Sequence, residues 1–290
     1  MNRVIDQTIE RIDPHAILAR QFSRAWFFTN ERIEPLLERL PNTDRIQSVF
    51  GVAGSGDFAL HAASRLRNVS RIDVSDVRPL ALLTTDLKIA LCRTLTPEDL
   101  EDVFRCRDSE NAQSVYSAVR EDVSAETRAV FDVIFENAAG RNFIRAIRKS
   151  GYWYPDGFRS VRRDAGYLPY LLPERSLALK AKIDTIRLHA GDFDRALSRF
   201  PDRAFDLVYV SNMFDSPRYC RDADRYLATI RAKLAPRGFV VSVTQHHPKK
   251  IERIFLPHGF SCAYRERHRF NILKAVCGDF DYSYLLFRAD

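Results

Sequence analysis

The sequence predicts an α/β fold with a mostly parallel, seven-stranded sheet that ends in an antiparallel hairpin. Strand-like and helix-like segments alternate along most of the chain, which is typical of a parallel sheet with helices on both faces. A glycine-rich turn joins the first expected strand to the helix after it. The last two strand-like segments, residues 260–270 and 281–288, are close enough in sequence to form an antiparallel hairpin.

The elements of this fold can be assigned in order from hydrophobic periodicity. Residues 1–43 have apolar residues at helical spacing, so we expect an N-terminal helical extension or cap, and residues 44–290 form the main domain. Strands are expected at 46–53, 69–74, 185–189, 205–210 and 238–243, and helices at 58–66, 80–91, 193–199 and 219–234. Asp57 is expected to cap the first of these core helices. A helical and aromatic insertion at about 97–183 separates the second strand from the third.

Composition and charge restrict the class of protein. The chain has 290 residues, of which 46% are hydrophobic and 29% charged, as in a folded globular domain. Charged residues near the N-terminus argue against a secretory signal, and no uncharged apolar run approaches the ~20 residues of a membrane helix. Its five cysteines lack the spacing of a disulfide framework or a metal site. We therefore expect a cytoplasmic protein without a metal and without integral membrane association.

The net charge of +7 has little predictive value here. Lys and Arg number 45 against 38 Asp and Glu, but the arginines are scattered along the chain and interleaved with acids. A nucleic-acid footprint requires clustering on one element. We therefore expect a small-molecule substrate and no nucleic-acid partner, and the sequence predicts no particular oligomeric state.

The strongest motif is the turn Phe50-Gly-Val-Ala-Gly-Ser-Gly-Asp57. Glycines at a strand-to-helix turn let the backbone approach a ligand closely. The spacing GxxGxG differs from the dinucleotide pattern, and no basic residue follows it as in a phosphate-binding loop. A nucleoside without a phosphate chain is therefore favoured, with a purely structural turn as the alternative. The expected ligand contacts of this turn are Gly51, Gly54, Ser55 and Gly56.

Three carboxylates are candidates for further contacts with a nucleoside. Asp73 lies near the end of the second expected strand, 17 residues beyond Gly56, and Asp76 follows it. An acid near this offset accepts hydrogen bonds from ribose hydroxyls in nucleotide-binding sheets. Asp192, after the third strand, is a candidate for the adenine amino group. For each acid the alternative is a helix cap.

Four residues are candidates for the chemistry itself. Ser211 and Asn212 follow the fourth strand, where polar side chains face the ligand crevice of an open sheet; a polar turn is the alternative. Asn137 precedes a glycine, and a helix C-cap is its competing role. Tyr170 belongs to the aromatic part of the insertion, which forms either a lid over a cation or a hydrophobic plug.

The stretch Gly51–Leu95 resembles the betaine-lipid-synthase type of S-adenosylmethionine (SAM)-dependent 3-amino-3-carboxypropyltransferase. The residues that carry this resemblance are Gly-Val-Ala-Gly-Ser-Gly-Asp-Phe-Ala-Leu, Ile-Asp-Val-Ser-Asp and Leu-Leu-Thr-Thr-Asp-Leu-Lys-Ile-Ala-Leu. Upstream, Trp26-Phe-Phe-Thr-Asn-Glu-Arg-Ile33 is similar to the aromatic segment of that family, which implies that Trp26 contacts the cofactor. Phe27-Phe28 stands where the family has Glu-Asp.

The resemblance implies a Rossmann-like class I SAM-dependent methyltransferase fold with SAM as cosubstrate. It also implies transfer of the 3-amino-3-carboxypropyl group of SAM to a small-molecule nucleophile, with release of methylthioadenosine. A variant is intramolecular transfer, in which the amine of SAM closes an azetidine-2-carboxylate ring. Two alternatives stay open: a small-molecule methyltransferase that releases adenosylhomocysteine, and a nucleoside-binding module without catalysis.

Overall fold

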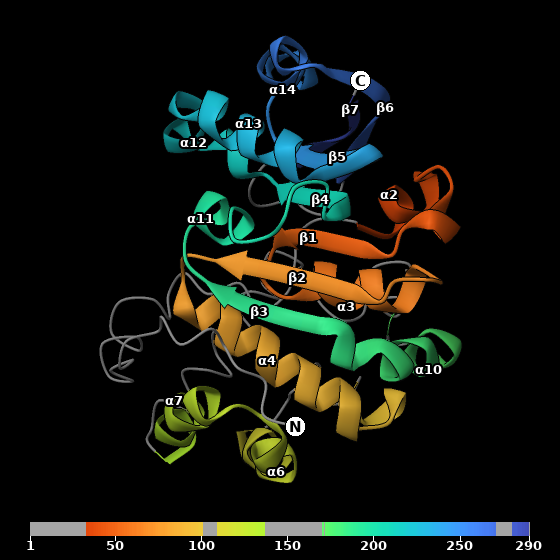
Figure 1. The fold of residues 1–290 in the computed structure, drawn as a ribbon. Helices are drawn as coiled ribbons and strands as arrows, with labels where there is room; N and C mark the ends of the chain where they lie inside the picture. Colours follow the sequence, from red (N-terminus) through yellow and green to blue (C-terminus); the bar gives the residue numbers. More distant parts are fainter. Residues whose placement is uncertain (1–32, 101–108, 137–169, 171, 271–279, 290) are drawn as a thin grey trace.

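The computed structural model describes residues 33–100, 109–136, 170, 172–270 and 280–289 (Figure 1). The strands are β1 (Ser48–Val52), β2 (Arg71–Asp76), β3 (Ile186–Ala190), β4 (Phe205–Ser211), β5 (Leu234–Thr244), β6 (Phe260–Phe270) and β7 (Phe280–Ala289). The α-helices are α2 (Ile33–Arg39), α3 (Asp57–Arg65), α4 (Pro79–Thr94), α6 (Ser109–Val119), α7 (Ala125–Glu136), α10 (Pro173–Lys182), α11 (Phe193–Leu197), α12 (Pro217–Arg221), α13 (Ala223–Lys233) and α14 (Pro248–Phe255).

The seven strands form one sheet in the order β3-β2-β1-β4-β5-β7-β6. The first five are parallel, and β7 lies antiparallel between β5 and β6. This arrangement confirms the Rossmann-like class I methyltransferase fold that the sequence predicts. The strand order reverses between β1 and β4, and open α/β sheets bind ligands outside the carboxyl ends of the strands at such a switch point.

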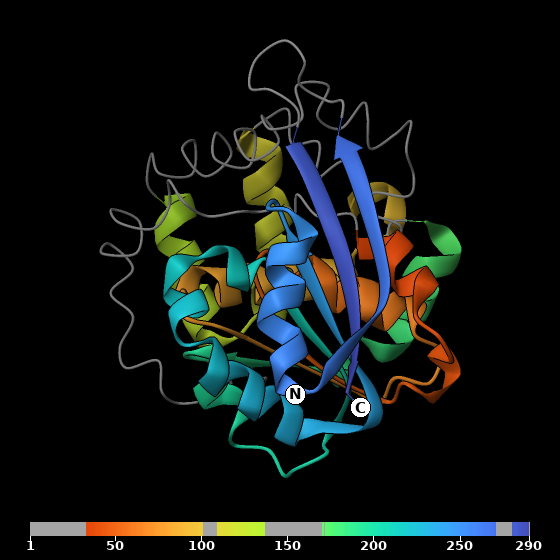
Figure 2. The same ribbon diagram turned by 90° about the horizontal axis from the view of Figure 1, so that it is seen from above.

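Two hydrophobic cores lie on the two faces of the sheet. One includes buried residues of α2, α3, α4, α7 and α10; the other includes buried residues of α11, α13 and α14. Figure 2 shows α14 beside the long β6–β7 hairpin. Phe50 of β1 contacts the rings of Phe193, Phe200 and Phe205 on the second face. Burial on both faces explains why the parallel strands are short, continuous apolar runs.

The element boundaries differ from the sequence-based expectation at two points that matter for the site. β2 extends to Asp76 and does not end at residue 74, because residues 72–76 pair with β3. The helix expected at 219–234 is divided into α12 and α13. The described part of the insertion contains α6, α7 and α10, all between β2 and β3, as predicted.

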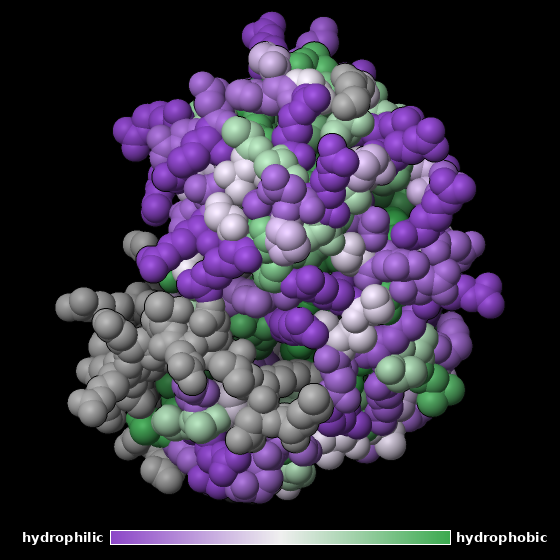
Figure 3. All heavy atoms as spheres, viewed as in Figure 1, coloured by the Kyte–Doolittle hydropathy of each residue, from purple (hydrophilic) through white to green (hydrophobic). Residues whose placement is uncertain are grey.

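The surface drawn in Figure 3 is largely hydrophilic, with hydrophobic side chains dispersed among polar ones. Among the described residues, no helix combines the length and the apolar character needed to cross a membrane.

Candidate functional site

A cavity of about 250 Å³ opens at the carboxyl ends of the central strands. Its volume lies slightly below the range of roughly 300–1,000 Å³ typical of small-molecule sites. Residues from the ends of three strands and from the segments that follow them line it: Val52, Ser75, Asp76, Val77, Arg78, Phe193, Val210, Ser211, Asn212, Met213 and Tyr219. The cavity therefore lies at the topological switch point, where the fold is expected to bind a ligand.

Polar side chains from neighbouring strands meet in this cavity. Ser211 and Asn212 line it, at the end of β4, where the sequence places them. Ser75 is 1% exposed, and its hydroxyl has no hydrogen-bond partner among the described residues. A buried hydroxyl without a partner costs free energy, and a ligand that bonds to Ser75 would remove this cost. Burial also raises the pKa of Tyr219, so its phenol stays neutral at physiological pH.

Asp76 connects the cavity to the glycine-rich turn. One carboxylate oxygen accepts a hydrogen bond from Gly54 N at 3.0 Å, and the other accepts from Arg78 N at 2.9 Å. Each carboxylate oxygen can accept more than one hydrogen bond, so Asp76 retains capacity for ligand hydroxyls. The carboxylate thus fixes the loop and faces the cavity at the same time.

The three glycines of the turn serve different structural needs. A Cβ on Gly51 would lie 2.7 Å from a ring carbon of Phe58, and one on Gly56 would lie 2.8 Å from Thr85 Oγ1. These two positions need glycine for the packing of α3 and α4. Gly54 has φ +54° with open space beside it, so its requirement is conformational. The backbone N–H group of Gly54 donates a hydrogen bond to the carboxylate of Asp76, which lines the cavity.

Asp73 lies in the middle of β2 and outside the cavity lining. It is fully buried, and its oxygens bond to Arg71 Nε at 2.5 Å and His189 Nε2 at 2.7 Å. The sequence-based placement of Asp73 at the strand end is therefore wrong, because the strand continues three residues beyond it. Asp76 occupies the position that had been expected for Asp73.

Asp192 is the N-cap of α11, the alternative that the sequence left open. Its carboxylate accepts from Asp194 N at 3.1 Å and from the Tyr226 hydroxyl at 3.0 Å. Burial, together with the hydrogen bond to Asp192, raises the pKa of Tyr226 to about 12. The neighbour of Asp192, Phe193, lines the cavity.

A buried ionic cluster lies directly behind the glycine-rich turn. Asp57 accepts hydrogen bonds from Ser55 Oγ at 2.8 Å, Lys88 Nζ at 2.8 Å and the Tyr170 hydroxyl at 2.6 Å. The side chains of Asp57 and Lys88 are fully buried. Burial lowers the pKa of the Lys88 ammonium, and the adjacent Asp57 carboxylate opposes that shift.

This cluster corrects one expectation. Asp57 is not the helix cap, because Gly56 occupies the N-cap position and Asp57 is the first residue of α3. Tyr170 and Ser55, two of the predicted site residues, bond to Asp57 and are not part of the cavity lining. Through Asp57, both residues help to fix the position of the turn.

Two predicted site residues, Trp26 and Asn137, lie outside the described residues. Eight of the eleven cavity residues are not among the predicted site residues, and Ser75, Phe193 and Tyr219 are three of them. Ser75 lies in the part of β2 beyond residue 74, and Tyr219 lies in the short helix α12, whose sequence has no ligand-related pattern. Within the described segments, no cluster of His, Cys, Asp and Glu has the arrangement of a metal site.

No protein-family profile matches the sequence, and no curated protein matches it significantly. Solved structures with a similar fold include the N-methyltransferase NodS from Bradyrhizobium japonicum WM9 in complex with S-adenosyl-l-homocysteine, at 11% identity. That match covers 96% of this chain and 99% of NodS, with a TM-score of 0.47. The [4+2]-cyclase SpnF is also 11% identical, over 96% of this chain and 93% of SpnF, with a TM-score of 0.46. The rRNA methyltransferase aviRa from Streptomyces viridochromogenes is 16% identical, over 98% and 96% of the two chains, with a TM-score of 0.44.

Proposed function

We propose that this protein is a SAM-dependent transferase that binds SAM in the cavity at the ends of β1, β2 and β4. The observation that carries the proposal is the combination of Asp76 and Ser75 in one cavity beside the glycine-rich turn. Asp76 offers a carboxylate for ribose hydroxyls, and Ser75 offers a buried hydroxyl that has no hydrogen-bond partner among the described residues. A carboxylate with spare acceptor capacity and a buried hydroxyl without a partner among the described residues favour a polar nucleoside over a purely apolar ligand.

The other walls of the cavity fit the remaining parts of SAM. Phe193 provides an apolar face for the adenine ring, and Tyr219 provides an aromatic face for a cation. SAM supplies a sulfonium whose three attached carbons are electrophilic. Ser211 and Asn212, on the β4 side, are in position to orient the acceptor or the amino acid part of SAM.

Within this class, we favour transfer of the 3-amino-3-carboxypropyl group to a small-molecule nucleophile or to the amine of SAM itself. In either reaction a bond forms to the γ-carbon, and the bond from that carbon to sulfur breaks with its electron pair on sulfur. The leaving product is methylthioadenosine. The support comes from the stretch Gly51–Leu95, which carries the family resemblance and also contributes Ser55, Asp57 and Lys88 to the buried cluster.

Methyl transfer is the second candidate, because the described cavity residues would accommodate the nucleoside equally well in either reaction. The two reactions differ in their nucleoside product. The purified protein is incubated with SAM alone and then with candidate amine and thiol acceptors, and the product is identified by mass. Methylthioadenosine supports aminocarboxypropyl transfer, and its formation without an acceptor indicates the intramolecular reaction. Adenosylhomocysteine would overturn the favoured reaction and support methyl transfer.

The binding site itself is tested by a matched pair of serine variants. Ser75 and Ser242 are both buried strand residues whose hydroxyls lack a partner among the described residues, but only Ser75 lines the cavity. Loss of one hydrogen bond corresponds to about 0.5–1.5 kcal/mol, so Ser75→Ala should raise the Kd for SAM roughly two- to tenfold. Ser242→Ala should leave it unchanged. Equal Kd values for both variants and the wild type, measured by calorimetry, would place SAM elsewhere.

A further inference from the structure

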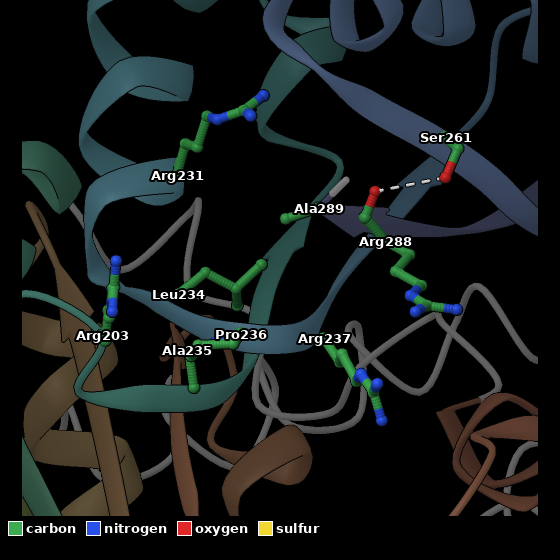
Figure 4. Close-up of a pocket in the computed structure, with 9 residues that line it drawn as sticks. All are labelled: Arg203, Arg231, Leu234, Ala235, Pro236, Arg237, Ser261, Arg288 and Ala289. Carbon is green, nitrogen blue, oxygen red and sulfur yellow. Dashed lines mark hydrogen bonds between the residues drawn. The ribbon is translucent and has the colours of Figure 1, made fainter.

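A second, larger cavity lies at the opposite edge of the sheet. It measures about 730 Å³ and is formed by the segment before β4, the C-terminal part of α13, the first residues of β5 and β6, and the last residues of β7 (Figure 4). Its lining residues are Arg203, Arg231, Leu234, Ala235, Pro236, Arg237, Ser261, Arg288 and Ala289. Four of these nine residues are arginines and none is acidic, which sets this cavity apart from the one at the carboxyl edge.

Two acids, Asp202 and Asp206, lie close in sequence to Arg203 and have hydrogen-bond or ion-pair partners outside the cavity lining. Asp202 pairs with Lys233 at 2.7 Å. Asp206 accepts hydrogen bonds from the backbone N–H groups of Gln47 and Ser48, both at 2.9 Å. Among the described residues, no ion pair neutralises the four guanidinium groups of the cavity. The described lining of the cavity therefore carries four positive charges, and that of Arg203 is partly offset by the carboxylate of Asp202.

Two of the four arginines occupy a backbone conformation that arginine disfavours. Arg203 has φ 59° and Arg237 has φ 65°. The left-handed region costs a residue with a Cβ roughly 1–2 kcal/mol, and glycine or asparagine would adopt it more readily. Disfavoured backbone conformations concentrate at functional sites. The turns alone would form more easily with glycine or asparagine at these positions. The presence of arginine at both therefore favours a function of the two guanidinium groups.

A third arginine is positioned by its surroundings. Arg231 Nη1 donates to the carbonyl oxygen of His258 at 2.5 Å. Its guanidinium lies where a Cβ on Gly259 would stand, because Nη1 would be 1.5 Å from that atom. Figure 4 shows Arg203 and Arg231 on one side of the segment Leu234–Pro236, and Arg237 and Arg288 on the other side. The arginines thus line the cavity from two sides.

We propose that this cavity binds a small phosphorylated anion, at a site separate from the SAM cavity. Guanidinium groups match phosphate oxygens in bidentate geometry, and several of them around one cavity of this size suit a ligand with two or more phosphate groups. The Ser261 hydroxyl, which bonds to the Arg288 carbonyl oxygen at 3.5 Å, adds a polar group to the rim. This proposal does not depend on the reaction at the carboxyl edge.

The test uses inorganic pyrophosphate as the probe and asparagine variants that tolerate the left-handed backbone. Calorimetry at 150 mM salt compares the wild type with Arg203→Asn/Arg237→Asn, which removes two charges without new backbone strain. The control Arg187→Gln/Arg253→Gln removes two charges from exposed arginines outside the cavity. We expect the cavity variant to raise the Kd for pyrophosphate about tenfold or more, and the control to change it less than twofold.

Equal weakening by both double variants, or no binding by the wild type, would overturn the proposal. A single-stranded RNA oligonucleotide is titrated in parallel. Tight RNA binding that both variants weaken equally, without pyrophosphate binding, would refute a small-anion site and indicate a diffuse nucleic-acid surface. The Kd for SAM is measured on the same samples and should be unchanged in Arg203→Asn/Arg237→Asn. An unchanged value shows that the variant is folded. It also separates the test of the anion site from the test of the proposed function.

Discussion

The ion pair between Lys88 and Asp57 makes a strong prediction for folding stability. Both side chains are fully buried, and Lys88 Nζ lies 2.8 Å from Asp57 Oδ1. Substitution of Lys88 by Met retains most of the side-chain volume and removes the charge. The Asp57 carboxylate then stays buried beside the hydroxyl donors of Tyr170 and Ser55 but without the ammonium of Lys88. Removal of one partner of a buried ion pair costs about 3–5 kcal/mol, because the other charge is left uncompensated.

We therefore expect Lys88→Met to lower the free energy of unfolding by about 3–5 kcal/mol. At a few degrees per kcal/mol for a chain of this size, the melting temperature should fall on the order of 10 °C. A matched control is Lys233→Met, because Lys233 Nζ lies 2.7 Å from an Asp202 side chain that is 72% exposed. Solvent screens a pair whose carboxylate is exposed, so the control should lose much less stability than Lys88→Met despite the shorter distance.

A double-mutant cycle identifies the cause of the loss. Asp57→Asn/Lys88→Met removes both charges and leaves an amide oxygen to accept from Tyr170 and Ser55. The double variant should be more stable than the sum of the two single changes predicts, by about 1–3 kcal/mol. Urea unfolding followed by circular dichroism gives each free energy. A loss below 1 kcal/mol in Lys88→Met, or strict additivity in the cycle, would refute the buried-charge explanation.

Three further predictions follow from individual contacts. Asp76→Asn should raise the Kd for SAM about tenfold or more, through loss of charge-assisted hydrogen bonds, whereas Asp73→Asn should change it much less; the reverse order would return the ribose contact to Asp73. Burial raises the pKa of Cys92 to about 12, so the folded state keeps a proton that the unfolded state loses above about pH 8.5. The free energy of unfolding should decrease as pH rises from about 9 towards 12, and Cys92→Ala should flatten that slope in urea titrations at pH 8 and pH 10.5; an unchanged slope would contradict the assignment. Gly51→Ala should destabilise the fold by about 1–3 kcal/mol through overlap with Phe58, and Phe58→Leu should recover part of the loss in the same assay; a Gly51→Ala variant as stable as the wild type would contradict the close contact.

Much of the fold is predictable because its signals are local. Buried parallel strands read as short apolar runs, and the glycine-rich turn marks the junction of β1 and α3. The boundary of β2 is harder to predict, because Ser75 and Asp76 are two consecutive polar residues after Val74, the last apolar residue of the strand. Pairing with residues 189–190 of β3 keeps them in the sheet, and no local pattern encodes that pairing. With the strand end two residues further along, Asp76, the second of the two predicted acids, takes the strand-end position, and Ser75 lies in the cavity lining without having been predicted there.

Long-range ion pairs are the part of the site that sequence patterns do not encode. An aspartate after the glycines has the local pattern of a helix cap, and the partners that change its role lie far away in the chain. Lys88 is 31 residues from Asp57, and Tyr170 is 113 residues away. Lys88 reaches Asp57 because α4 packs beside α3. Tyr170 reaches it because this residue, just before α10, lies close to the start of α3.

This convergence also connects the stability of the fold to its proposed chemistry. Asp57 holds Ser55 of the glycine-rich turn, Lys88 of α4 and Tyr170 near the start of α10 at one carboxylate. The same turn presents Gly54 N to Asp76 in the cavity. A change in the cluster is therefore expected to move the turn relative to the ligand, and Tyr170→Phe, which loses only the hydroxyl, should alter SAM binding through position rather than through contact. Its effect on the Kd should shrink in the Asp57→Asn background, where a neutral amide oxygen accepts a weaker hydrogen bond than the carboxylate does; an effect of equal size in both backgrounds would mean that Tyr170 acts on the ligand directly.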